Sequence, residues 1–168
     1  MPFNLLKRYN QLLDIISLGG SERNKTLKGV FKRDFEDKLT VFCGKNVFPT
    51  PQNNGEIPME TLFRHLTTEM IDKKTRERAF ELNRSQRLHW VKYHLDLNKK
   101  ENMLLFSVKE PEGNRTYYYD KDEKYVIVLE PLRDGISYYL LSAYHVRGKD
   151  AQRNKIEKKY RRKLEAVL

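Results

Sequence analysis

Cationic, imidazole and hydroxyl side chains gather in residues 83–97 and 138–145, and together they could act on a phosphodiester. Arg84, Arg87 and His94 lie in a predicted helix, whereas Ser142 and Tyr144 lie in a predicted strand. RNA carries its own nucleophile, the 2′-hydroxyl, so a protein need supply only a base, an acid and cations that stabilise the transition state. We assign the two arginines to the phosphate, His94 to proton transfer, and the two hydroxyls to a phosphate oxygen or the leaving group.

The same residues also have structural explanations. An arginine on a helix is commonly solvated or salt-bridged, and a histidine beside apolar residues is commonly a hydrogen-bonded, half-buried side chain. Ser142 and Tyr144 share a strand face with core candidates, so packing with a satisfied hydroxyl remains an alternative. Tyrosines could stack on bases, although tyrosine also favours strands. The candidate substrate contacts are Trp90, Lys92, Tyr117, Tyr119, Tyr139 and His145.

Patterns for metal or nucleotide chemistry are missing from the sequence. The four histidines, His65, His89, His94 and His145, form no H-x-x-x-H pair on one helix face. Phosphate-binding glycine loops are absent as well, so we expect no metal and no cofactor. A single cysteine, Cys43, excludes an internal disulfide and is interpreted as structural.

Charge points to a polyanionic partner. Lysine and arginine number 33 against 23 acidic residues, which gives a net charge of +10. Such a surface attracts phosphate backbones and loses this attraction as salt rises. An anionic membrane surface is the lesser candidate, because no segment has the apolar length to span a bilayer and the first residues lack a secretory apolar region. We expect a cytoplasmic protein that contacts RNA and does not enter a membrane.

The first part of the chain is predicted to be helical and rich in loops. Apolar residues at helical spacing predict an amphipathic helix from Leu5 to Ile16, ended by Gly19-Gly20. Residues 21–56 are interpreted as irregular, with strand-like runs at 40–43 and 47–48 and breaks at Pro49, Pro51, Asn53-Asn54-Gly55 and Pro58. A short helix is predicted over 59–65 and a further helical turn at 67–69.

The second part is predicted to contain a long helix and a strand meander. A helix over 75–97 would place Arg84 in the middle of its apolar face, with Arg87, Trp90 and His94 along the flank and His89 and Lys92 on an exposed face. Because an unpaired buried charge costs several kcal/mol, Arg84 should meet a carboxylate, a cage of carbonyls, a water-filled cleft or a bound anion. The strands are expected at 103–108, 115–119, 125–129 and 136–146, followed by a basic helix over 150–168.

These elements predict an α+β fold. It consists of N-terminal helices, a four-stranded antiparallel sheet with a helix packed on one face, and a C-terminal basic helix. We divide the chain into an N-terminal helical and loop-rich region, 1–75, and a second region, 76–168; the first could be part of the same domain.

Short motifs in residues 83–164 resemble the phage-associated nuclease domains of the barnase, EndoU, colicin and RelE (BECR) superfamily. An Arg-x-x-Arg-x-x-Trp-Val helix holds Arg84, Arg87, Trp90 and Val91, and a Tyr-x-x-Val-Leu strand begins at Tyr125. A third motif, Tyr-x-Leu-Ser-Ala-Tyr, spans 139–144, with serine where threonine is frequent, and a lysine-rich helix follows. The segment 62–68 also resembles the one that often leads into such domains.

The resemblance implies a BECR-like nuclease domain in residues 76–168. It implies metal-independent endonuclease cleavage of transfer or messenger RNA, often by toxins of prophages, and carries over Arg84, Arg87, Ser142 and Tyr144. We therefore expect a ribonuclease of phage or mobile-element origin that leaves a 2′,3′-cyclic phosphate and is restrained by an acidic inhibitor (antitoxin) protein. The alternatives are a non-catalytic nucleic-acid-binding module and a phage-associated adaptor protein.

Overall fold

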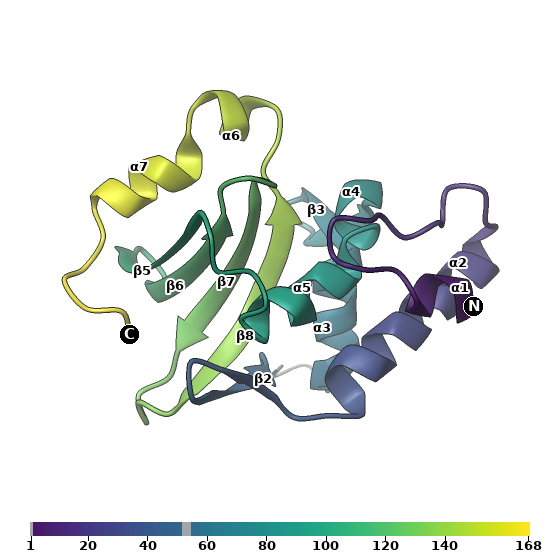
Figure 1. Ribbon diagram of the computed structural model, residues 1–168, viewed down its shortest axis with the longest axis horizontal. Coiled ribbons are helices and arrows are strands. Elements are labelled where there is room, and N and C mark those ends of the chain that lie inside the picture. Colours follow the sequence, from purple (N-terminus) through teal and green to yellow (C-terminus); the bar gives the residue numbers. More distant parts are fainter. Residues whose placement is uncertain (1, 52–54) are drawn as a thin grey trace.

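The structure is a computed structural model that describes residues 2–51 and 55–168 (Figure 1). A mixed sheet carries helices on both faces and is accompanied by a two-stranded hairpin. The helices are α1 Pro2–Leu5, α2 Gly20–Phe31, α3 Pro58–Thr67, α4 Leu82–Ser85, α5 Leu88–Leu95, α6 Lys149–Gln152 and α7 Lys155–Arg161, and a π-helical turn, η1 Lys32–Glu36, extends α2. The strands are β1 Thr40–Phe42, β2 Lys45–Pro49, β3 Thr68–Asp72, β4 Glu77–Phe80, β5 Met103–Glu110, β6 Gly113–Asp120, β7 Tyr125–Pro131 and β8 Ser137–His145.

The main sheet has six strands in the order β1-β2-β8-β7-β6-β5. Strands β5 to β8 form the antiparallel meander that the short connections predict. The prediction of a sheet with four antiparallel strands is wrong, because β2 pairs with β8 in parallel, from Asn46 opposite Ser137 to Pro49 opposite Leu140. Strand β1 then pairs with β2. The two strand-like runs were visible locally, but their pairing with β8 joins segments far apart in the chain.

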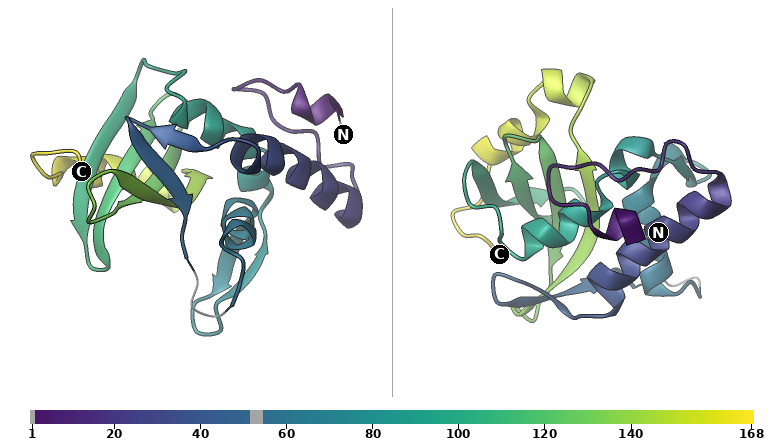
Figure 2. Two further views of the ribbon diagram at one scale, coloured as in Figure 1. Left: turned by 90° about the horizontal axis from the view of Figure 1, so that it is seen from below. Right: turned by 45° about the vertical axis from the view of Figure 1, so that its right-hand side comes forward.

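Each face of the sheet has its own apolar core. On the face covered by α2, α3 and α5, buried side chains such as Trp90 and Tyr138 pack with Leu13 and Leu27 from the first 75 residues. The opposite face is covered by α7, whose Ile156 packs on Phe106. Figure 2 shows the larger helical layer on one side of the sheet. The first 75 residues therefore supply two sheet strands and part of this core.

The predicted helix over 75–97 is wrong in its first half. Residues 77–80 form β4, which pairs with β3, and so the predicted helical turn at 67–69 is also replaced by the start of a strand. The chain turns into α4 at Glu81, whose carboxylate accepts hydrogen bonds from the backbone N–H groups of Asn83 (3.1 Å) and Arg84 (2.7 Å). Such a cap begins a new helix rather than continuing an old one. A break at residues 86–87 then separates α4 from α5.

Both ends of the chain depart from the predicted helices. The helix expected over Leu5–Ile16 is wrong, because α1 ends at Leu5 and Asn4 instead bonds the backbone N–H (2.8 Å) and carbonyl (3.0 Å) of Asp14. Helix α2 occupies part of the segment interpreted as irregular.

The predicted helix 150–168 is broken at Asn154, which adopts a left-handed φ of 50°, and helical structure ends at Arg161. The predicted short helix 59–65 is confirmed as part of α3. Asn53 and Asn54 lie outside the described residues.

Candidate active site at the edge of strand β8

The C-terminal half of β8 has a free edge. Pairing with β2 ends where Pro49 meets Leu140, and proline has no N–H with which to continue a ladder. On the other side, β7 pairs Leu129 with Leu140 and Val128 with Ser142, so Leu141 is an extra, bulged residue. A bulge of this kind re-aims the side chains that follow it. Beyond it, the edge is met by α3 and α4 instead of a strand.

Arg84 in α4 reaches this edge. Its Nη1 donates to the carbonyl of His65 (2.8 Å) and to the hydroxyl of Ser142 (3.3 Å), and its Cζ lies 5.4 Å from the centre of the Tyr144 ring. The Nε atom is buried and has no partner in the described part of the chain. The fold thus brings together three residues that the sequence placed in one site, Arg84, Ser142 and Tyr144.

Arg87 follows α4 and lies beside the same edge. Its Nη1 donates to the carbonyl of Asn83 (2.9 Å) and its Cζ lies 5.1 Å from the Trp90 ring. As in Arg84, Nε is buried, and none of the described residues accepts a hydrogen bond from it. Burial and the positive charge of Arg87 lower the pKa of half-buried His145 at the end of β8. The ring of His145 contacts the carbonyl of Glu123 through Nδ1 (3.1 Å).

The cations at this edge lack ion-pair contacts with carboxylates in the described residues, although the negative charge of Glu81 acts on both Arg84 and Arg87. Arg78 in β4 donates to the hydroxyl and the carbonyl of Thr68 (2.8 Å each). Within residues 2–51 and 55–168, none of Arg78, Arg84 and Arg87 forms an ion pair with a carboxylate. Glu81 caps α4 and pairs with Arg147 (3.0 Å). Burial lowers the pKa of Arg78, and repulsion from Arg84 lowers it further. The edge is therefore a cationic surface suited to an anion.

His65, to which the sequence reasoning gave no role, belongs to this site. It lies near the end of α3 and is half-buried, and its main-chain carbonyl accepts the hydrogen bond from Arg84 Nη1 (2.8 Å). Burial lowers its pKa, and the positive charges of Arg78, Arg64 and Arg84 lower it further. The packing of α3 against β8 joins segments far apart in the chain, and the sequence gives no local signal of it.

The structure places His94 in the core. The residue is 1% exposed, its Nδ1 faces the carbonyl of Trp90 (2.6 Å), and its Nε2 faces the carboxylate of Asp120 (2.9 Å). Asp120 also accepts from Tyr9 and pairs with Lys99 (3.0 Å). These contacts match the structural explanation of His94 considered above.

The candidate substrate contacts are divided between core and surface. Trp90, Tyr117 and Tyr119 are buried, with exposed fractions of 2%, 5% and 2%. Lys92 pairs with Asp96 (3.2 Å), and Tyr139 is half-buried. The prediction that His89 lies on an exposed face is wrong: it is 5% exposed, and its Nε2 contacts the carbonyl of Arg8 (2.9 Å). Of the six, Trp90 lies against Arg87 (5.1 Å from Cζ to the ring centre), and the positive charge of Arg87 lowers the pKa of His145.

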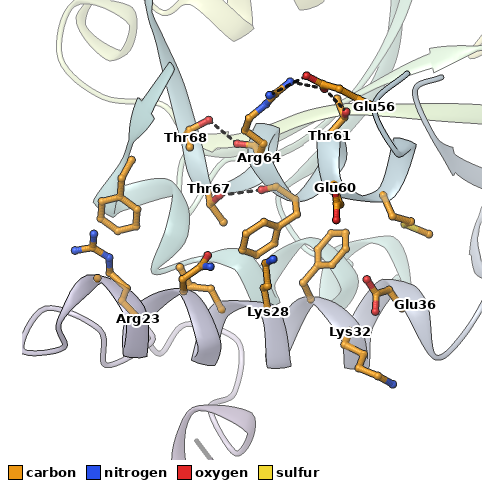
Figure 3. A pocket seen from close by; sticks show the side chains of 17 residues that line it. Arg23, Lys28, Lys32, Glu36, Glu56, Glu60, Thr61, Arg64, Thr67 and Thr68 are labelled. Atoms are coloured by element: carbon orange, nitrogen blue, oxygen red, sulfur yellow. Dashed lines mark hydrogen bonds and ion pairs between the residues drawn. The ribbon is translucent and has the colours of Figure 1, made fainter. Parts of the chain in front are cut away.

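A groove of about 730 Å³ lies elsewhere, between α2 and α3 (Figure 3). Its floor is apolar, and its rim mixes cations with the carboxylates of Glu36, Glu56 and Glu60. Glu56 pairs with Arg64 (2.7 Å), and Arg23 lies 3.8 Å over the ring of Phe80. Because its charges are mixed and partly paired, this groove suits a polyanion less well than the β8 edge does.

Within residues 2–51 and 55–168, no helix has both the length and the apolar character that crossing a membrane requires. These residues also contain no group of three or more histidine, cysteine, aspartate or glutamate side chains arranged to hold a metal ion.

Comparison of the chain with family models, curated proteins and solved structures finds no match.

Proposed function

We propose that the protein is a metal-independent ribonuclease that binds the RNA backbone at the β8 edge. The observation that carries the proposal is the group of arginines Arg78, Arg84 and Arg87, which form no ion pair with a carboxylate among the described residues. Arg84 also donates to the Ser142 hydroxyl. These arginines are half-buried, a position that is costly for a cation with no carboxylate in contact, and a bound phosphate would offset this cost. The net charge of +10 supports an RNA partner, as does the resemblance to BECR nucleases.

The proposed reaction is transphosphorylation. The 2′-oxygen of RNA attacks the adjacent phosphorus, the bond from phosphorus to the 5′-oxygen breaks, and a 2′,3′-cyclic phosphate and a 5′-hydroxyl result. The transition state carries more negative charge on the phosphoryl oxygens than the substrate does. Arg84 and Arg87 stabilise this charge, and the Ser142 hydroxyl donates to a phosphoryl oxygen. Burial raises the pKa of Tyr144, so its hydroxyl keeps its proton at neutral pH and can also donate.

The test is incubation of the purified protein with total cellular RNA and a chelator, with product ends examined for a cyclic phosphate. Arg84→Gln should lower the cleavage rate by about 10²- to 10³-fold, because one preorganised charge at the transition state is removed. Arg23→Gln is the matched control: it makes the same change in the α2–α3 groove and should leave the rate unchanged. Full activity of folded Arg84→Gln protein would contradict the proposal.

Two outcomes would favour the other functions. RNA that is bound but stays intact would indicate a nucleic-acid-binding module that uses the same cations. Weak binding that disappears at moderate salt and does not depend on Arg84 would indicate an adaptor. Should discrete transfer or messenger RNA fragments form, we propose a toxin of phage or mobile-element origin, with an acidic inhibitor that complements the basic surface.

A further inference from the structure

The site at the β8 edge opens onto the face of the sheet that α7 covers. Ser142 and Tyr144 are two residues apart in β8, after the bulge, so their side chains point to the same face. Tyr144 packs there against the apolar core that holds Ile156 of α7. Helix α7 itself lies against β5 (Figure 1), which is three strand spacings from β8, about 14 Å at about 4.8 Å per strand. A polyanion bound at the edge can therefore reach α7 only if it extends across this face.

One side of α7 fixes the helix on the sheet. Ile156 is 0% exposed, and the ring of Tyr160 makes a T-shaped contact with the ring of Phe106, with 5.2 Å between the ring centres. Lys159 forms an ion pair with Glu110 of β5. Because these contacts all lie on one side of the helix, the opposite side faces solvent.

The solvent-facing side of α7 is cationic. Lys155, Lys158 and Arg162 follow one another at intervals of three and four residues, so they line one side of the helix, and Arg161 lies beside them. All four side chains are exposed. Lys155 and Arg162 each pair with a carboxylate, at 3.2 and 3.4 Å. Lys158 and Arg161 form no ion pair with any carboxylate in residues 2–51 and 55–168.

A basic helix of this kind suits either RNA or an anionic membrane, and its apolar side decides between them. A helix that binds a membrane surface inserts its apolar side among the lipids. In α7 that side, with Ile156 and Tyr160, packs on the sheet. Contacts with phosphates need only the exposed cations, so the backbone of RNA fits α7 better than a bilayer does.

We propose that α7 is a second binding surface for the RNA backbone, where Lys158 and Arg161 contact phosphates several nucleotides away from the one that is cleaved. This inference rests on the proposed ribonuclease function and narrows the substrate to RNA long enough to reach from the β8 edge to α7. Because the contacts are the same in the bound substrate and in the transition state, they lower KM and leave kcat unchanged. A dinucleotide, whose only internucleotide phosphate is the one that is cleaved, gains nothing from α7.

The experiment compares the wild-type protein with Lys158→Gln/Arg161→Gln and with a matched control, Lys25→Gln/Arg133→Gln. The control also removes one lysine and one arginine that are exposed and have no ion pair with a carboxylate of the described residues. Lys25 lies in α2, on the other face of the sheet, and Arg133 lies in the turn between β7 and β8. Binding is measured by fluorescence anisotropy with a long, single-stranded 2′-O-methyl RNA, which lacks the nucleophile.

In the α7 variant the slope of log affinity against log salt should fall by about 1.4, because each phosphate contact with a single strand contributes about 0.7. The affinity should fall by about 10- to 30-fold at about 0.1 M salt. On cleavable RNA, the advantage in kcat/KM of a long strand over a dinucleotide should shrink by the same factor, through KM. The control should keep the affinity and the slope of the wild-type protein.

The outcomes separate this inference from the function on which it rests. Wild-type affinity and slope in the α7 variant, or an equal loss in the control, would overturn the inference and leave cleavage untouched. Binding to phosphatidylserine vesicles that depends on Lys158 and Arg161 and is not displaced by RNA would overturn it in favour of a membrane. If the wild-type protein binds long RNA through α7 but cleaves neither substrate, the ribonuclease function fails and the binding surface stands. If it binds no RNA, both fail.

Discussion

Removing the Arg84 cation should leave the fold about as stable as before, although it should lower the cleavage rate by about 10²- to 10³-fold. In Arg84→Gln the charge-assisted hydrogen bond to the His65 carbonyl is lost, at a cost of about 1.5–3 kcal/mol. The unpartnered, buried Nε is removed as well, which relieves a penalty of about 1–3 kcal/mol. Because the two terms largely cancel, the free energy of unfolding should change by no more than about 2 kcal/mol.

Asp120→Asn provides the comparison, because Asp120 is a buried charge that does have partners. It is 0% exposed, faces His94 and Lys99 at 2.9 and 3.0 Å, and accepts from Tyr9. Removing one member of such a buried network costs about 3–5 kcal/mol.

Urea unfolding of wild-type, Arg84→Gln and Asp120→Asn proteins, followed by far-ultraviolet circular dichroism, measures both changes on one scale. A loss of about 3–5 kcal/mol in Arg84→Gln would refute the reasoning, since it would identify Arg84 as a structural cation like the members of the Asp120 network.

Three further predictions concern the core and the edge. His94→Gln should lower the unfolding free energy by about 2–3 kcal/mol yet keep the pH–rate profile of cleavage, because His94 is buried on Asp120; a lost acidic limb would contradict this. Arg87→Gln should weaken binding of single-stranded RNA and reduce the slope of log affinity against log salt by about 0.7, measured by fluorescence anisotropy; an unchanged slope would remove Arg87 from the phosphate contacts. Burial opposes ionisation of Asp120, but hydrogen bonds from His94, Tyr9 and Lys99 outweigh it and hold its pKa well below the usual range. The resulting stability is present above the unfolded pKa of about 3.9 and is lost as pH falls below it, so the stability gap between wild type and Asp120→Asn should shrink below about pH 4.

The strands were predictable because their signals are local. Four apolar and tyrosine-rich runs separated by short turns predict a meander, and β5 to β8 follow it closely. Strands β1 and β2 carried the same kind of signal, but no local pattern says that β2 lies in parallel beside β8. The prediction of the first helix failed for a related reason. The backbone of residues 6–16 forms tertiary contacts, such as the hydrogen bond from the Leu13 N–H to the Gln86 carbonyl (2.9 Å).

The candidate site was predictable where residue type alone was informative. Arg84, Ser142 and Tyr144 meet in space although two of them lie 58 residues from each other. The proton acceptor was placed by projecting residues 75–97 onto one continuous helix, and that projection fails at the break before α5. Because α4 and α5 are separate helices, the directions of Arg84 and His94 are not related by 100° per residue around one axis. His94 instead lies in the core.

The edge of β8 explains why the site lies where it does. An unpaired strand edge exposes backbone groups that could pair with another chain, and proteins commonly protect such edges with bulges and charged side chains. Here Pro49 stops β2, Leu141 bulges, and Arg84, which is bound to the His65 carbonyl, meets the edge. The groups that protect the edge are therefore the groups proposed to bind and cleave RNA. Extending β2 along this edge would satisfy the same backbone, but it would cover Ser142 and displace His65 and Arg84, so the interrupted strand is a requirement of the proposed site.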